Sequence, residues 1–211
     1  KWGHEHAAEE RYNRFWRGVP PKSRGDYAFI THMVEVARKG KGRVGVVVPH
    51  GVLFRGGAEG KIRKGMLEDD IIEAVIGLAP NLFYGTGIPA CVLVVNKAKP
   101  EERKGKVLFI HGAEQMVEGK NQNTLSQENV DQLVKGYWDW TEEERFSRVV
   151  ELEEIQKNDW NLNIARYVQT AEPEEEIDVA AELKVLKELQ GQRDAAEAKM
   201  MGFLKELGYD A

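Results

Sequence analysis

Short apolar runs separated by polar turns occupy the first 112 residues, and the segments between them carry hydrophobic residues at helical spacing. The unbroken apolar run at 43–48 is typical of a strand buried on both faces. Asp26 can cap the first helix and Gly40 follows its last turn. In chain order, the pattern predicts a helix at 26–40, a strand at 43–48, a helix at 58–67, strands at 70–78 and 90–97, and a strand at 106–112.

This order of elements predicts the C-terminal half of a doubly wound α/β sheet. No strand is predicted before residue 26, where such a fold would place its glycine-rich first turn. Residues 1–25 contain Pro20 and Pro21, which prevent a continuous helix, and we interpret this segment as a long loop.

The pattern becomes mainly helical after residue 112. We expect a helix at 125–140 with Ser126 as its cap, and a β-like run at 148–155 before the polar turn "NDWNLN". An acidic linker at 171–178 precedes a long amphipathic helix or helix pair at 179–208, which Gly191 would break. The expected organisation is three regions: 1–112, 113–176 and 177–211.

The composition favours a globular protein. Hydrophobic residues make up 42% of the 211 positions and charged residues 31%. No apolar run reaches the roughly 18 residues of a membrane span, so no membrane partner is expected. The single cysteine, Cys91, excludes a disulfide framework and favours the reducing cytoplasm. His4 and His6 lack further ligands at recognisable spacing, and we expect no metal site.

Charge is distributed unevenly along the chain. The net charge of −5 combines +8 over residues 1–64, −4 over 65–140 and −9 over 141–211. A basic first third suggests an anionic partner, although an uneven surface would show the same gradient. The segment "RGGAEGKIRKG" lacks the glycine at position 55 and the hydroxyl at position 62 that a phosphate loop requires. Its cations either contact DNA phosphates or form a solvated helix face. The candidate DNA contacts are Lys22, Arg24, Arg55, Lys61, Arg63 and Lys64.

Gly85, Gly87 and Ala90 have the G-x-G-x-x-A spacing of a dinucleotide-binding turn. A strand-like run follows them instead of a helix, and Pro89 interrupts the turn, so we do not expect a nucleotide there. Just before the glycines lies the aromatic pair "FY" at 83–84. It either plugs the core beneath a loop or forms a platform on which a planar ligand stacks.

The segment from "PPKSRGDYAFITH" to "ACVLVVNKAKP", together with "NDWNLNIARYV" at 158–168, resembles the modification (M) subunit of type I restriction-modification systems. That family is an adenine-N6 DNA methyltransferase that uses S-adenosylmethionine. The resemblance, which covers about residues 20–170, implies a Rossmann-like methyltransferase sheet whose last strand is antiparallel, followed by a mainly helical extension. It also implies that Phe83, with Tyr84 as its neighbour, stacks against a target adenine that is flipped out of the duplex.

Two family features are missing from this sequence. The only Pro-Pro pair lies in "VPPK", so there is no Asn-Pro-Pro-aromatic motif, and no glycine-rich cofactor turn follows a first strand. We therefore expect a C-terminal portion of the subunit, with no catalytic residue and no bound cofactor of its own, that does not methylate DNA alone. The intact subunit would use S-adenosylmethionine.

The resemblance also implies partners. These are DNA, a specificity (S) subunit that binds the helix at 179–208, and a restriction (R) subunit in the full complex. The alternative is a non-catalytic interaction module. Such a module would hold nucleic acid with its basic first third and a protein with its tail.

Overall fold

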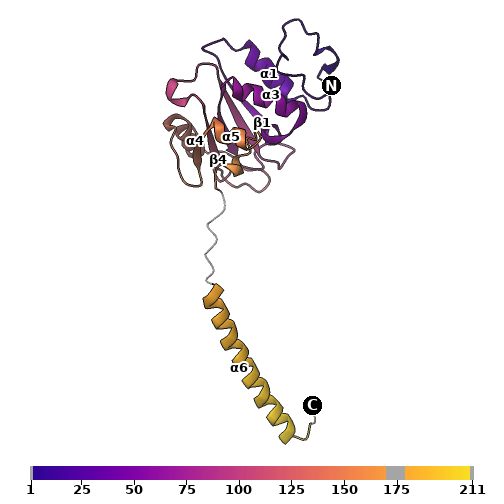
Figure 1. Ribbon diagram of the computed structural model, residues 1–211, viewed down its shortest axis with the longest axis vertical. Helices are drawn as coiled ribbons and strands as arrows, with labels where there is room; N and C mark the ends of the chain where they lie inside the picture. Colours follow the sequence, from indigo (N-terminus) through magenta and orange to yellow (C-terminus); the bar gives the residue numbers. More distant parts are fainter. Residues whose placement is uncertain (1, 170–178, 210–211) are drawn as a thin grey trace. The chain divides into compact units, whose positions relative to one another are not determined.

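The computed structural model describes residues 2–169 and 179–209, and its contacts divide the chain into two units, 1–170 and 171–211 (Figure 1). The acidic linker expected at 171–178 lies outside the described residues. The first unit contains η1 (His4–His6), α1 (Asp26–Val36), β1 (Arg43–Pro49), α2 (Gly51–Phe54), α3 (Gly57–Glu68), β2 (Ile72–Leu78), β3 (Ala90–Asn96), η2 (Glu101–Arg103), β4 (Lys106–Gly112), α4 (Gln127–Asp139), β5 (Ser147–Glu151), α5 (Leu152–Lys157) and η3 (Ile164–Arg166).

The five strands form one mixed sheet in the order β1-β3-β2-β4-β5. β3 is antiparallel to both of its neighbours, with Pro49 of β1 paired to Ala90 and Gly77 of β2 paired to Cys91. β2 and β4 are parallel, and β5 returns antiparallel to β4. The α/β class and the antiparallel strand expected from the resemblance are confirmed.

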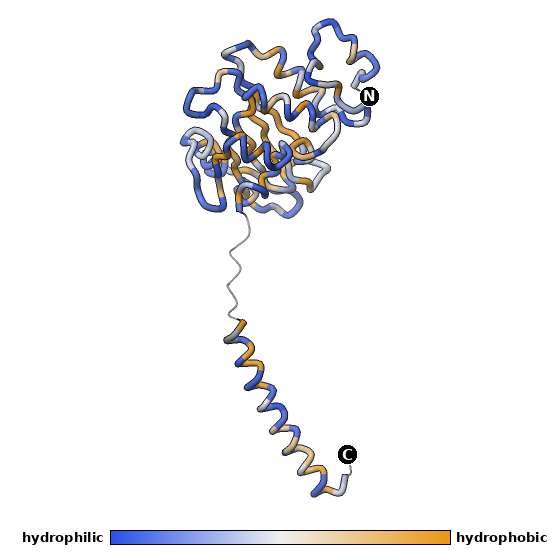
Figure 2. The backbone as a smooth tube through the Cα atoms, in the orientation of Figure 1, coloured by the Kyte–Doolittle hydropathy of each residue, from blue (hydrophilic) through white to orange (hydrophobic). Residues whose placement is uncertain are grey.

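Apolar side chains fill both faces of the sheet, and Figure 2 shows hydrophobic segments inside the first unit. On one face α1, α2, α3 and the segment 155–168 cover the sheet, where Phe109 stacks on Tyr167 with ring centroids 4.4 Å apart. On the other face Leu133 of α4 packs in a smaller cluster with Phe146. Each large apolar side chain that is fully buried contributes about 1.5–3 kcal/mol to folding.

The prediction that strand 43–48 is buried on both faces is wrong. β1 is an edge strand of the sheet, and its alternate residues point outward, so that Val47 is 51% exposed while Val48 is buried. Helix α4 packs mainly against β4 on the opposite face of the sheet, and it meets β1 at the start of that strand, where the guanidinium of Arg43 lies over the ring of Trp138. An apolar run in a short strand therefore does not show how many of its faces are covered.

Two further element boundaries differ from the sequence pattern. α1 ends at Val36 because Ala37 is already extended, and Asp26 does not cap it but accepts a hydrogen bond from Arg55. The run at 148–155 is strand only as far as Glu151, after which α5 begins. By contrast, Ser126 caps α4 as predicted, its hydroxyl accepting from the backbone N–H of Asn129.

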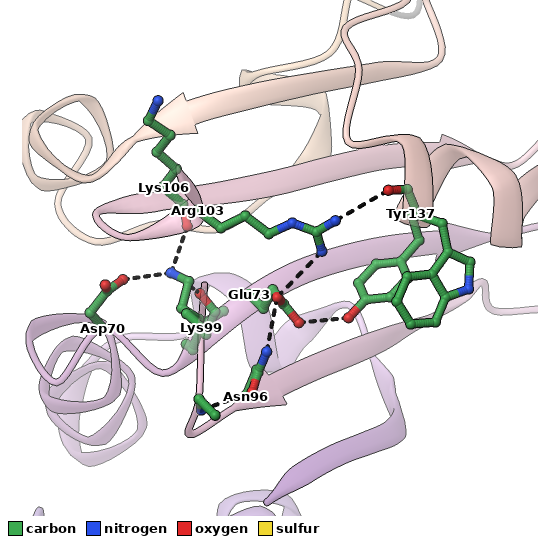
Figure 3. Close-up of polar contacts among 10 residues, drawn as sticks. Asp70, Glu73, Asn96, Lys99, Arg103, Lys106 and Tyr137 are labelled. Atoms are coloured by element: carbon green, nitrogen blue, oxygen red, sulfur yellow. Dashed lines mark hydrogen bonds and ion pairs between the residues drawn. The ribbon is translucent and has the colours of Figure 1, made fainter. Parts of the chain in front are cut away.

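A buried polar cluster joins β2, β3 and α4 (Figure 3). The carboxyl group of Glu73, wholly buried, accepts from Tyr137 Oη at 2.6 Å and from Asn96 Nδ2 at 3.0 Å. The guanidinium of Arg103 lies 3.5 Å from the same carboxyl group and 4.3 Å from the ring of Trp140. Glu73 sits at a bulge in the β2–β3 pairing, and a bulge redirects the side chain of the extra residue.

A second buried cation lies beside this cluster. Lys99, 8% exposed, donates from Nζ to Asp70 Oδ1 at 2.5 Å and to the carbonyl oxygens of Ile72 and Lys106 (Figure 3). All three donors of the ammonium group are used, which offsets the cost of burying its charge. The lysine thereby ties the start of β2 to the start of β4.

The second unit contains one described helix, α6 (Val179–Glu206), which continues through Gly191 without a break. Figure 2 shows hydrophobic and hydrophilic residues alternating along it. Exposed hydrophobic residues of α6 include Leu183, Val185, Leu186, Leu189, Met200, Met201 and Phe203, and the exposed Leu207 follows its last residue. Among the described helices, none has the length and apolar character needed to cross a membrane.

Replacing Tyr137 should change both stability and its dependence on alkaline pH. Burial raises the pKa of Tyr137 to about 12, and its hydrogen bond to Glu73 acts in the same direction. The phenol therefore stabilises the fold fully below pH 10 and loses that contribution as the pH rises towards 12. Tyr137→Phe should lower the free energy of unfolding by about 1–3 kcal/mol at pH 8 and flatten its decline above pH 10.

Urea unfolding followed by circular dichroism at a series of pH values measures both effects. Tyr209→Phe is the control, because Tyr209 is 66% exposed. An unchanged slope above pH 10 in Tyr137→Phe would contradict the assignment of alkaline sensitivity to this phenol.

Candidate functional site

The aromatic pair of the sequence analysis lies in the loop 79–89, which joins β2 to β3. Phe83 is 41% exposed and Tyr84 is 93% exposed, so neither ring plugs the core. The backbone N–H of Thr86 donates to the carbonyl oxygen of Phe83 at 3.4 Å, and Gly85 between them has a φ of +76°. This tight turn presents both rings to solvent at the end of the sheet where β1 and β2 finish.

The segment "NQN" at 121–123 braces this loop. Gln122 Nε2 donates to the carbonyl oxygen of Leu82 at 2.7 Å, and Asn123 Nδ2 donates to that of Pro80 at 3.0 Å. The backbone N–H of Asn123 also donates to Asn81. The sequence analysis missed these positioning residues. The available signal was a run of three amides between two predicted elements, which is too common to indicate a partner 40 residues away.

The glycines of the loop do not form a dinucleotide site. Gly85 and Gly87 are followed by strand β3, whereas a pyrophosphate turn needs a helix at that point. A second turn of related spacing, G-x-G-x-x-G, begins at Gly40, where the chain passes from α1 into β1, the reverse of the required order. The residues described therefore do not fit a dinucleotide or a methyl donor at either turn.

The candidate phosphate contacts separate into two groups. Lys22 and Lys61 are exposed, and the described residues provide neither with an ion-pair partner. Arg24, whose side chain is 57% exposed, lies 3.9 Å from Glu59, and Lys64 lies 3.6 Å from Glu68. These four cations come from the N-terminal segment and from α3, and the contact between Arg24 and Glu59 brings the two together.

The remaining two candidates hold the fold together. Arg63 is 3% exposed, and its guanidinium donates to the carbonyl oxygens of Val52, Arg55 and Trp160. Arg55 donates to Asp26 at 2.9 Å and to Glu59 at 3.0 Å. The donors of Arg63 in particular are not available to a phosphate in this structure.

Nothing in the described part of the chain groups three or more metal-ligating side chains. Cys91 is buried, and burial raises the pKa of its thiol to about 12, which makes it a poor nucleophile. Burial also lowers the pKa of His111.

Comparison with known proteins decides the family. The model of the N-6 DNA methylase family matches residues 1–176. The chain belongs to this family. Over 198 residues it is 46% identical to the type I restriction enzyme MjaVII methylase subunit of Methanocaldococcus jannaschii. This match covers 92% of this chain and 34% of that protein. It is 37% identical over 202 residues to the MjaVIII methylase subunit of the same organism, covering 94% of this chain and 34% of that protein.

The fold of this N-6 DNA methylase chain also matches a solved structure. The methyltransferase subunit of a type I restriction-modification system from Streptococcus thermophilus superposes with a TM-score of 0.73 at 37% identity, over 80% of this chain and 36% of that one. The chain thus spans about a third of the length of these relatives. The family resemblance seen in the sequence is confirmed.

Removing the amide brace should loosen the aromatic loop of this N-6 DNA methylase chain. A Gln122→Ala, Asn123→Ala variant loses the two side-chain hydrogen bonds to Leu82 and Pro80, at about 1 kcal/mol each. Amide hydrogen exchange of residues 81–88 should become faster, while that of β3 is unchanged. Gln127→Ala, which removes an exposed hydrogen bond to Asp131, is the control. Unaltered exchange in the loop would show that the amides do not position it.

Proposed function

We propose that this chain supplies the target-base loop and part of the DNA-binding surface of an adenine-N6 DNA methyltransferase, the modification subunit of a type I restriction-modification system. The observation that carries the proposal is the braced loop 79–89, which presents Phe83 and Tyr84 to solvent. A flipped adenine would stack on Phe83, and base–aromatic stacking contributes about 1–3 kcal/mol per base. The exposed side chains of Lys22 and Lys61 support contact with the DNA backbone.

The methyl donor of the intact subunit is proposed to be S-adenosylmethionine, from family membership. The described residues of this chain do not fit that donor, because both glycine turns have the wrong neighbouring elements. They also contain no Asn-Pro-Pro-aromatic sequence to polarise the adenine amine. The role derived for this chain is therefore to bind and orient DNA. The buried free thiol of Cys91 is compatible with a reducing cytoplasm, which we propose as its compartment.

Helix α6 is proposed to dock on the specificity subunit, and the assembled complex would also contain the restriction subunit. All of the large apolar side chains described on this 28-residue helix remain solvent-exposed or half-buried in its own unit. A helix that leaves apolar residues at helical spacing uncovered is suited to pack against helices of a partner.

The target-base role can be tested in a chimera. Residues 20–170 of this chain would replace the matching segment of the MjaVII methylase subunit, with which the chain is 46% identical. We expect the chimera to transfer methyl groups from S-adenosylmethionine to adenine N6 in the presence of its specificity subunit. Phe83→Ala in the chimera should lower kcat/KM about 5- to 150-fold, the equivalent of losing one stacking contact.

The control for the chimera is Phe29→Ala, which removes an exposed aromatic ring outside the loop. Phe83→Trp should retain most of the activity, because it keeps a flat ring for stacking. Full activity in Phe83→Ala would contradict the proposed role of this loop.

Deleting residues 177–211 should abolish association with the specificity subunit while the first unit stays folded, because the two units have separate contacts. A milder variant, Leu186→Glu with Leu189→Glu, places charge on the apolar side of α6 and should weaken association at least tenfold. Lys187→Glu with Lys184→Glu changes charge at exposed polar positions of the same helix and is the matched control. Analytical ultracentrifugation measures the association, and binding retained by the deletion would refute the docking role.

A further inference from the structure

A cavity of about 430 Å³ lies between α3 and the segment 158–166. Two stretches that the sequence analysis treated separately form its walls, "RGGAEGKIRKG" and "NDWNLNIAR". Lys61 and Lys64 line it from α3, and Trp160 and Arg166 line it from the later segment. The fold thus brings together cations that are about a hundred positions apart in the chain.

The charge of this cavity is strongly positive. Four of its lining residues are cations and Asp159 is its one carboxylate. Lys61 and Arg166 are exposed, and within the described ranges 2–169 and 179–209 neither side chain has a hydrogen-bond or ion-pair partner. Lys64 is held over the ring of Trp160, 5.5 Å from its centroid. Two unpaired cations facing one hollow favour an anion as its occupant.

The wall opposite α3 is held in a costly backbone conformation. Asp159 and Trp160 both have positive φ, 54° and 57°, which non-glycine residues rarely adopt. The conformation is fixed from both sides, because Trp160 N–H donates to Ile155 and its carbonyl oxygen accepts from Arg63 at 2.8 Å. Strain of this kind persists where the surroundings over-determine it, and it is concentrated at ligand sites.

Hydrogen bonds and ring stacking also fix the rest of the segment 158–166 on the core. Tyr167 donates from its hydroxyl to the carbonyl oxygen of Asn161 at 2.5 Å and stacks on Phe109 in the core. Leu162 N–H donates to the carbonyl oxygen of Leu53 at 2.9 Å. Arg166 therefore projects from a rigid support, so less conformational entropy is lost when it binds a ligand.

One wall of the cavity begins close to the end of the sheet that carries the aromatic loop. Pro49 at the end of β1 pairs with Ala90, the first residue after that loop, and His50 Nε2 lies 3.1 Å from the carbonyl oxygen of Ala90. Phe54, Gly56 and Gly57 of the cavity follow only a few residues later. One wall of the cavity and the aromatic loop therefore both start from this end of the sheet.

We infer that this cavity binds a phosphate group of the DNA backbone, with Lys61 and Arg166 as its direct contacts and Lys64 beside them. The inference rests on the proposed DNA-binding function and adds Arg166 and the segment 158–166 to its surface. Arg63 is a positioning residue here, since it holds the carbonyl of Trp160 and is itself buried.

The test uses the 211-residue chain and a fluorescein-labelled duplex of 12 base pairs of mixed sequence. Fluorescence anisotropy gives the binding constant between 25 and 200 mM salt for the wild type and for Lys61→Ala, Arg166→Ala and the double variant. Each lost phosphate contact should reduce the slope of log K against log salt by about 1, for every duplex sequence. Lys157→Ala is the matched control, because Lys157 is exposed and basic but does not line the cavity.

A second variant guards against loss of fold. Gly56 has extended backbone angles at the N-cap of α3, and a Cβ there meets nothing within 4 Å. Gly56→Asp therefore fits without a steric clash while it adds a negative charge to the cavity wall. It should leave the thermal midpoint of unfolding unchanged and weaken DNA binding, a combination that a merely structural role of this site would not produce.

The outcomes separate the possible occupants. Slopes equal to wild type in Lys61→Ala and Arg166→Ala, or no DNA binding by the chain at 25 mM salt, would overturn the inference. Thermal stabilisation by inorganic tripolyphosphate that both variants abolish, without any change in the DNA slope, would identify a free polyphosphate instead and would also overturn it.

The same inference can fail or survive independently of the proposed function. If Phe83→Ala inactivates the chimera while the cavity variants bind DNA normally, only the cavity assignment is wrong. If the cavity variants lose their salt slope while Phe83→Ala is fully active, the phosphate site stands and the target-base role is wrong.

Discussion

The insertion of β3 between β1 and β2, antiparallel to both, is the constraint on which the arrangement of the functional surfaces depends. Because β3 runs opposite to β2, the loop between them begins and ends at the same end of the sheet. β1 also finishes at that end, and the chain there turns directly into α2 and α3. The reversed direction of β3 therefore brings the aromatic loop, the start of α3 and the cations around it to one end of the sheet.

Much of the secondary structure follows from local sequence. The short apolar runs, the Ser126 cap and the proline pair act over a few neighbouring positions, and each element that they indicated is present. What depends on distant parts of the chain could not be predicted. Val47 is exposed because it points away from Val46 and Val48, which pack in the core, and the capping role of Asp26 is lost because Arg55, far along the chain, binds its carboxylate instead.

In the candidate site, too, some features follow from local sequence and others depend on distant parts of the chain. The exposed rings at Phe83 and Tyr84 lie where a loop between two strands must place them. Arg63 is different, because one of the carbonyl oxygens that removes it from the surface is 97 positions away. Arg166 could not be predicted as a site residue for the same reason. It is a lone arginine in a short 3₁₀ helix, and only the folded chain places it across the cavity from α3. Composition and spacing identify the cationic residues. Only the tertiary structure distinguishes those that face solvent from those that donate hydrogen bonds to backbone carbonyl oxygens.

The bulge at Glu73 has a consequence for how the sheet reaches a unique pairing. Beside the bulge, Ile72 and Ala74 belong to cores on opposite faces, which a regular strand would not allow. If β2 slipped by one residue against β3, the carboxyl group would lose Tyr137 and Asn96 while remaining enclosed by apolar side chains. A shifted register is thus energetically unfavourable at the centre of the sheet, and the buried carboxyl group of Glu73 favours the native alignment of β2 with β3.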